Sequence, residues 1–208
     1  MSDLTQSNPW DELRAHTSAR IALGRVGSSL PTREVLKFGL AHAQARDAVH
    51  RPLDFAGLRE QLDSAGFRTL HVCSDAPDRP TYLLRPDKGR HLQDDCYARL
   101  SAQAPAPELA IVIADGLSSI AVQRHAVPLL ELFRQRFNTD WANTPVVLAE
   151  QGRVAIGDGI GVALRARLVI VLIGERPGLT SPDSLGLYLS YQPQVGMMDS
   201  QRNCISNV

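Results

Sequence analysis

Cysteine is scarce in this sequence. The 208 residues include only three cysteines, Cys73, Cys96 and Cys204, which are odd in number and show no C-x-x-C spacing. This pattern argues against both a disulfide framework and a zinc knuckle. We therefore expect a protein of a reducing compartment, the cytoplasm.

A secretory leader and long apolar runs are also missing. The opening residues, MSDLTQSNPWDEL, have no basic stretch followed by an apolar one, and no segment approaches the roughly 18 consecutive apolar residues of a membrane span. Basic and acidic residues both total 22, so the net charge is zero and no long basic run occurs. We expect a soluble protein whose partners are neither membranes nor nucleic acids.

The motifs of several enzyme classes are absent. No G-x-G-x-x-G joins a strand to a helix, because DGLSS follows the apolar run 109–114 and GDGIG at 157–161 has the wrong spacing. A nicotinamide cofactor is therefore not expected, and no phosphate-binding loop motif is present. The histidines form neither H-x-x-x-H nor H-E-x-x-H, so we expect no metal site. These histidines are His16, His42, His50, His71, His91 and His125.

A serine hydrolase is one alternative. Ser118 and Ser119 precede a predicted helix, and His125 follows within it, but the G-x-S-x-G elbow that exposes a nucleophile is missing. We expect these serines to cap the helix instead.

The residues that are abundant indicate an α/β fold. Hydrophobic residues make up 44% of the chain and aromatic residues only 5%, which is typical of an aliphatic core. Residues 109–114, 145–149 and 168–173 are short uninterrupted apolar runs, the pattern of parallel strands buried on both faces. Helical segments are predicted between them, around 127–137 and 156–166. The result is a Rossmann-like three-layer domain with a mostly parallel sheet.

The remaining residues divide into two parts. Apolar spacings and helix caps predict helices over 10–20, 32–50 and 55–66, which we assign to a small N-terminal helical lobe spanning residues 1–66. The α/β domain then spans residues 67–208. Within it, 67–74 and 81–86 are predicted as short strands, and a helix is predicted within 87–103.

Polar segments follow each of the three apolar runs. They are Asp115-Gly116, residues 151–154 and residues 175–178. Since right-handed crossovers bring the carboxyl ends of parallel strands to one edge, where open sheets bind ligands, these segments predict a binding crevice. Pro177 and Gly178 form a tight turn that holds Glu175 in place; an ordinary solvated turn is the alternative.

The segment LLRPDKGR, residues 83–90, has two interpretations. It is either a solvated hairpin end, with an Arg85–Asp87 pair contributing between 0 and roughly 1 kcal/mol, or a contact surface for a partner chain or an anionic group.

Six segments together resemble the small subunit of ethanolamine ammonia-lyase, an adenosylcobalamin-dependent enzyme. GERPG, CISN and LRPDxGR are the most specific parts of this resemblance. The segments run in the family's order and cover nearly the whole chain; they are residues 17–27, 82–90, 113–119, 152–161, 171–179 and 199–207.

This resemblance implies the cofactor-binding half of a lyase that converts ethanolamine to acetaldehyde and ammonia. The large subunit of the family holds the substrate and the acid–base residues, so this chain would bind the cofactor without catalysing, and the radical chemistry belongs to the cofactor. Residues 67–208 would form the cobalamin-binding domain. The family's cobalamin contacts carry over to Val154, Glu175 and Cys204. The absence of D-x-H-x-x-G implies that the cofactor keeps its own base.

The chain departs from the family at both ends. It lacks the N-terminal extension of enteric relatives that is linked to bacterial microcompartments, which favours a free cytoplasmic complex. It stops at Val208, where relatives continue into a final helix. A stand-alone Rossmann-type binding module without lyase activity is therefore the alternative.

Overall fold

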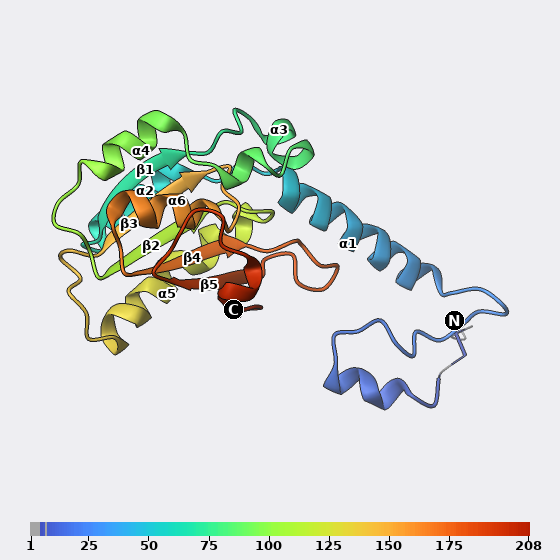
Figure 1. Ribbon diagram of the computed structural model, residues 1–208. Helices are drawn as coiled ribbons and strands as arrows, with labels where there is room; N and C mark the ends of the chain where they lie inside the picture. Colours follow the sequence, from blue (N-terminus) through green and yellow to red (C-terminus); the bar gives the residue numbers. More distant parts are fainter. Residues whose placement is uncertain (1–4, 7) are drawn as a thin grey trace.

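A computed structural model describes residues 5–6 and 8–208, so residues 1–4 and 7 of the predicted N-terminal lobe lie outside the described residues. The described chain forms a six-stranded sheet of order β1-β3-β2-β4-β5-β6 (Figure 1). β1, β3, β2 and β4 are parallel to one another. β5 pairs antiparallel with β4, and β6 pairs antiparallel with β5. In chain order the strands are β1 Arg68–Cys73, β2 Leu109–Ala114, β3 Pro145–Glu150, β4 Leu168–Gly174, β5 Leu185–Tyr191 and β6 Asn203–Ile205.

Helices cover both faces of this sheet. α2 (Phe55–Ser64) and α5 (Ser119–Arg136) pack on one face, in a core that includes Leu58 and Leu130. α4 (Asp94–Ser101) and α6 (Ile156–Leu164) pack on the other, around Leu100 and Ile160. Every residue of β2 is buried, as its unbroken apolar run predicts. The predicted α/β class and mostly parallel sheet are confirmed; the Rossmann-like assignment stays a prediction.

The glycine-rich segment at 157–161 belongs to α6. A Cβ atom on Gly157 would lie 2.5 Å from Cγ2 of Val171 on β4, so glycine lets this helix approach the sheet closely. GDGIG is therefore a packing feature of a helix and not a nucleotide loop.

The prediction of a strand at 81–86 is wrong. These residues belong largely to α3 (Arg79–Leu84), whose first turn is capped by the Asp78 side chain accepting from the Thr81 N–H at 2.8 Å. An Asp cap followed by Pro80 favours a helix start over the local β propensity of TYLL. The helix predicted within 87–103 begins later than residue 87, at α4, after the 3-10 turn η2 (Lys88–Arg90).

The C-terminal strands were not predicted. β5 contains a glycine and is only partly buried, and the three residues of β6 are all exposed, so neither shows the apolar run of a buried strand. A 3-10 turn, η3 (Asp199–Gln201), precedes β6.

The N-terminal helices do not gather into one compact unit. A 3-10 turn, η1 (Asp11–His16), comes first, and α1 (Thr32–His50) then extends away from the sheet (Figure 1). α2 instead packs into the core of the sheet. The helical lobe is thus not confirmed, and the boundary at residue 66 stays a prediction. No described helix has the length and apolar character needed to cross a membrane.

Candidate functional site

The loops that follow β2, β3 and β4 meet at the carboxyl edge of the sheet. The Asp115 carboxylate accepts hydrogen bonds from the backbone N–H groups of Gly116 and Gly152, both at 3.1 Å. The Leu117 N–H donates to the Gly174 carbonyl at 2.9 Å. The convergence of the three polar segments, predicted from their places in the sequence, is confirmed.

Two glycines make the contact between the β2 and β4 loops possible. Gly116 has a φ of +59°, and a Cβ on it would lie 2.2 Å from the Gly174 carbonyl oxygen. A Cβ on Gly174 would lie 2.0 Å from the Ser118 carbonyl oxygen. The two loops are therefore in backbone contact that leaves no room for a side chain at either position.

Asp115 is the buried polar centre of this edge. It lies within 3.4 Å of the Arg79 guanidinium, which also donates to the Gly116 carbonyl at 2.8 Å. Burial raises the pKa of the Asp115 carboxyl to about 6, although Arg79 and the backbone N–H donors act in the opposite direction. Arg79 also donates from Nε to the Val49 carbonyl at 2.8 Å, so the end of α1 is tied to the same edge.

Two adjoining cavities open at this edge. The smaller has a volume of about 400 Å³ and is lined by residues that include Gly116 and Glu175. The larger has a volume of about 800 Å³ and lies against Asp158 among other residues. Both are lined by the same three side chains, Arg153, Val154 and Tyr188. A ligand larger than either cavity could therefore occupy both.

Glu175 is held in one orientation by hydrogen bonds to both carboxylate oxygens. Ser184 Oγ donates to Oε2 at 2.8 Å, and Ser206 Oγ donates to Oε1 at 2.7 Å. The Glu175 N–H also donates to the Ser184 carbonyl at 2.9 Å. The carboxylate lines the smaller cavity and is only partly buried, so it can still accept a hydrogen bond from a ligand.

The other two candidate residues lie around Tyr188. Val154 and Tyr188 pack against the same side of the core. Cys204 on β6 is the register partner of Tyr188 on β5, is exposed, and places its Sγ 3.6 Å from Ser206 Oγ. Burial, followed by a hydrogen bond with Cys204, raises the pKa of the Tyr188 phenol to about 12. The structure therefore brings Val154 and Glu175 to one cavity and Cys204 to the tyrosine beside it.

Sequence reasoning missed Tyr82, Arg153 and Tyr188. Tyr82 is buried, and its hydroxyl donates to the Gly152 carbonyl at 3.2 Å. The Arg153 guanidinium lies over the Tyr82 ring, 4.2 Å from its centre, and donates to the Tyr82 carbonyl at 3.0 Å. Arg153 lies in the polar segment 151–154 and Tyr82 in the family segment 82–90, but neither was singled out as a site residue, and Tyr188 lies in none of these segments.

Residues 83–90 do not form the end of a hairpin, and they are only partly exposed to solvent. Arg85 and Asp87 form an exposed ion pair at 2.7 Å, but Gly89 is buried and its carbonyl accepts the Arg153 N–H at 2.7 Å. Pro86 and Arg90 line the larger cavity. The segment is thus part of the candidate site as well as part of the surface.

The structure argues against the serine hydrolase alternative, because neither serine is placed as a nucleophile beside His125. Ser118 is fully buried and is the N-cap of α5, where its Oγ accepts from the Ala121 N–H at 3.3 Å and donates to the Pro182 carbonyl at 2.7 Å. Ser119 donates to the Arg51 carbonyl at 2.7 Å. His125 instead lies 3.7 Å from Asp183. The capping role expected for Ser118 is confirmed, and Ser119 begins the helix.

Comparisons with known proteins identify the family of this chain. Residues 7–208 match the family model described as ethanolamine ammonia-lyase light chain (EutC). The chain is 57% identical over 206 residues to the ethanolamine ammonia-lyase small subunit of Pseudomonas fluorescens (strain Pf0-1), covering 97% of this chain and 75% of the relative. It is 54% identical over 215 residues to the small subunit of Azotobacter vinelandii, covering 100% and 80% respectively. The chain therefore belongs to the ethanolamine ammonia-lyase small-subunit family.

Proposed function

We propose that this chain binds part of adenosylcobalamin at the carboxyl edge of its sheet, as the small subunit of a cytoplasmic lyase that converts ethanolamine to acetaldehyde and ammonia. The observation that carries the proposal is the meeting of Val154 and Glu175 in one cavity, with Cys204 beside the same tyrosine. These three residues are distant in the sequence and are the ones that the family resemblance selects.

The chemistry of the site fits the proposed cofactor. Carboxamide groups surround a corrin ring, and their N–H donors match the Glu175 carboxylate, whose orientation is fixed by two serine hydroxyls. A hydrogen bond to a charged group contributes about 1.5 to 3 kcal/mol, equivalent to roughly ten- to hundredfold in affinity. The partly exposed Arg153 side chain lines both cavities, so its guanidinium is a donor available to an amide or phosphate oxygen of the ligand.

The residues of this chain would bind and orient the cofactor. Val154 and the Tyr188 ring supply apolar contact, Glu175 accepts hydrogen bonds, and Cys204 adds a small side chain at the rim. When bound, adenosylcobalamin supplies the radical through homolysis of its cobalt–carbon bond. The substrate and the acid–base groups would belong to the large subunit, which gives this chain a non-catalytic role.

Co-expression with the large subunit tests the proposal. The two chains are expected to purify as one hetero-oligomer that releases ammonia from ethanolamine only when adenosylcobalamin is added. Failure to co-purify, together with no ammonia release, would favour the alternative of a stand-alone binding module.

A further inference from the structure

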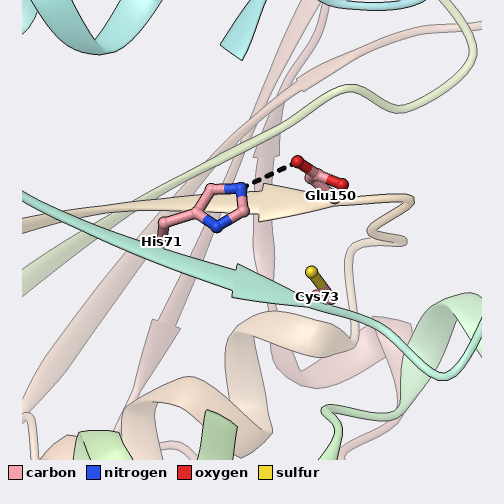
Figure 2. A group of neighbouring side chains, drawn as sticks. All are labelled: His71, Cys73 and Glu150. Carbon is pink, nitrogen blue, oxygen red and sulfur yellow. Dashed lines mark hydrogen bonds and ion pairs between the residues drawn. The ribbon is translucent and has the colours of Figure 1, made fainter. Parts of the chain in front are cut away.

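A histidine, a cysteine and a glutamate meet where β1 and β3 lie side by side. His71 and Cys73 are two residues apart on β1 and therefore project from the same face of the strand. Glu150, the last residue of β3, is the register partner of Cys73. Figure 2 shows the His71 ring and the Glu150 carboxylate joined by a hydrogen bond, with the Cys73 sulfur close to both.

The geometry points to a binding site for a Zn²⁺-like divalent cation, and we propose that His71, Cys73 and Glu150 are its ligands. One ligand atom of each lies within 4.8 Å of the other two, and His71 Nε2 is 2.8 Å from Glu150 Oε1. Zinc bonds of about 2.0 to 2.3 Å in tetrahedral geometry place neighbouring ligand atoms roughly 3.3 to 3.7 Å apart. Small side-chain rotations would therefore open the His71–Glu150 pair and draw in the sulfur.

The donor set restricts the kind of metal. A thiolate and an imidazole are poor ligands for Mg²⁺ and Ca²⁺, whereas one sulfur, one nitrogen and one oxygen suit Zn²⁺ or Co²⁺. Three protein ligands leave a fourth tetrahedral position for water. Side chains of His71 and Glu150 are 38% and 40% exposed, so an ion could enter from solvent.

The surroundings contain charges of both signs. Glu150 and Asp95 favour a cation, and Arg99, which donates to the His71 carbonyl at 3.4 Å, opposes one. Burial, followed by the Glu150 charge, raises the pKa of the Cys73 thiol to about 11, so a metal ion must displace the thiol proton when it binds. The Phe55 ring lies edge-on to His71, with ring centres 5.8 Å apart.

The site would fix the edge of the sheet beside the candidate cofactor cavities. Ser74, next to Cys73, donates from Oγ to the carbonyl of Gln151 at 2.8 Å. Gln151 follows Glu150 directly and begins the loop that carries Val154. A cation bridging the two strand ends would therefore stabilise the start of this loop. The proposal is independent of the identity of the ligand in the cavities.

Titration of the metal-free full-length chain with Co²⁺ tests the site. We expect one Co²⁺ per chain with sulfur-to-cobalt charge-transfer absorption, which Zn²⁺ abolishes by displacement. Cys73→Ser should remove the charge-transfer band, and His71→Ala and Glu150→Gln should each weaken binding by about tenfold or more. Cys204→Ser, which removes an exposed thiol elsewhere, should change neither the band nor the affinity.

A second measurement distinguishes the loss of a metal ligand from the loss of the fold. Zn²⁺ should raise the melting temperature of the wild-type chain more than that of Glu150→Gln, whose partly exposed side chain can change without opening the core. No charge-transfer band in the wild type, a band that persists in Cys73→Ser, or equal Zn²⁺ stabilisation of Glu150→Gln would overturn the proposal.

Discussion

Arg202 and Asp158 form a buried bidentate ion pair that fixes the segment before β6 to α6. Their side chains are 1% and 3% exposed, and Arg202 Nη2 lies 2.7 Å from Asp158 Oδ2. Arg202 also donates to Ser190 Oγ at 3.0 Å and to the Met197 carbonyl at 2.8 Å. Cys204 lies two residues beyond Arg202, so this pair anchors the start of the strand that carries the sulfur.

Removing one member of this pair should cost far more stability than removing both. Arg202→Ala leaves the Asp158 carboxylate buried and unpaired, and we expect it to lower the free energy of unfolding by about 3 to 5 kcal/mol. An Arg202→Met/Asp158→Leu double variant should recover much of this loss. Urea denaturation measures both, with Arg167→Ala, which disrupts an exposed pair with Glu108, as the control. Equal losses in the single and double variants would contradict a charge-burial explanation.

Asp115 should make the chain less stable as the pH rises. Its folded pKa of about 6 lies above its ordinary value of 3.8, so the folded state binds more protons between these values. The stabilising contribution of the protonated carboxyl is complete below about pH 4 and is lost as the pH rises through about 6, a change on the order of 3 kcal/mol. Unfolding of wild type and Asp115→Asn should be compared across this range. If the difference in stability between them does not fall with rising pH, Asp115 is not the responsible group.

The contact between Gly174 and the loop after β2 should not tolerate a side chain. Gly174→Ala places a Cβ against the Ser118 carbonyl, and we expect a loss of about 1 to 3 kcal/mol or more in unfolding free energy. Gly178→Ala is the matched control, because its nearest neighbour would lie 3.7 Å away. Similar melting temperatures for the two variants would show that the loops can separate at low cost.

The sequence predicted the central strands well because burial on both faces leaves an unbroken apolar run. Residues 109–114 and 168–173 coincide with β2 and nearly with β4. The strand predicted at 81–86 failed because the Asp78 cap outweighs the β propensity of the following residues. β6 could not be predicted, since its strand character comes from pairing with β5 and not from its own three residues.

The candidate site was predictable only in part. Strand-end positions showed that Asp115 and Glu175 would approach one another, because parallel strands share a carboxyl edge. The segment that contains Arg153 carried the same signal, but the contact of its guanidinium with Tyr82 did not, and Tyr188 carried none because its place depends on the antiparallel strand β5. Motif spacing could not predict the cluster of His71, Cys73 and Glu150, because His71 and Glu150 lie on different strands and 79 residues apart in the sequence.

Glu175 should contribute to cofactor affinity without being required for the fold. In the complex with the large subunit, we expect Glu175→Ala to weaken adenosylcobalamin binding by roughly ten- to hundredfold, because the carboxamide donors lose a charged acceptor. Glu131→Ala on the exposed surface of α5 serves as the control. Equilibrium dialysis measures the affinity, and circular dichroism checks the fold. An affinity equal to that of the control would remove Glu175 from the cofactor site.

The most direct test of a cofactor site at this carboxyl edge is the adenosylcobalamin affinity of the two-subunit complex after the cavities are filled. Val154→Trp places a large ring where the two cavities adjoin, whereas Leu132→Trp adds the same ring to the exposed side of α5. We predict that the Val154→Trp complex assembles but binds adenosylcobalamin at least about a hundredfold more weakly, equivalent to about 3 kcal/mol, while the Leu132→Trp complex binds normally. An assembled Val154→Trp complex with wild-type affinity would contradict the account.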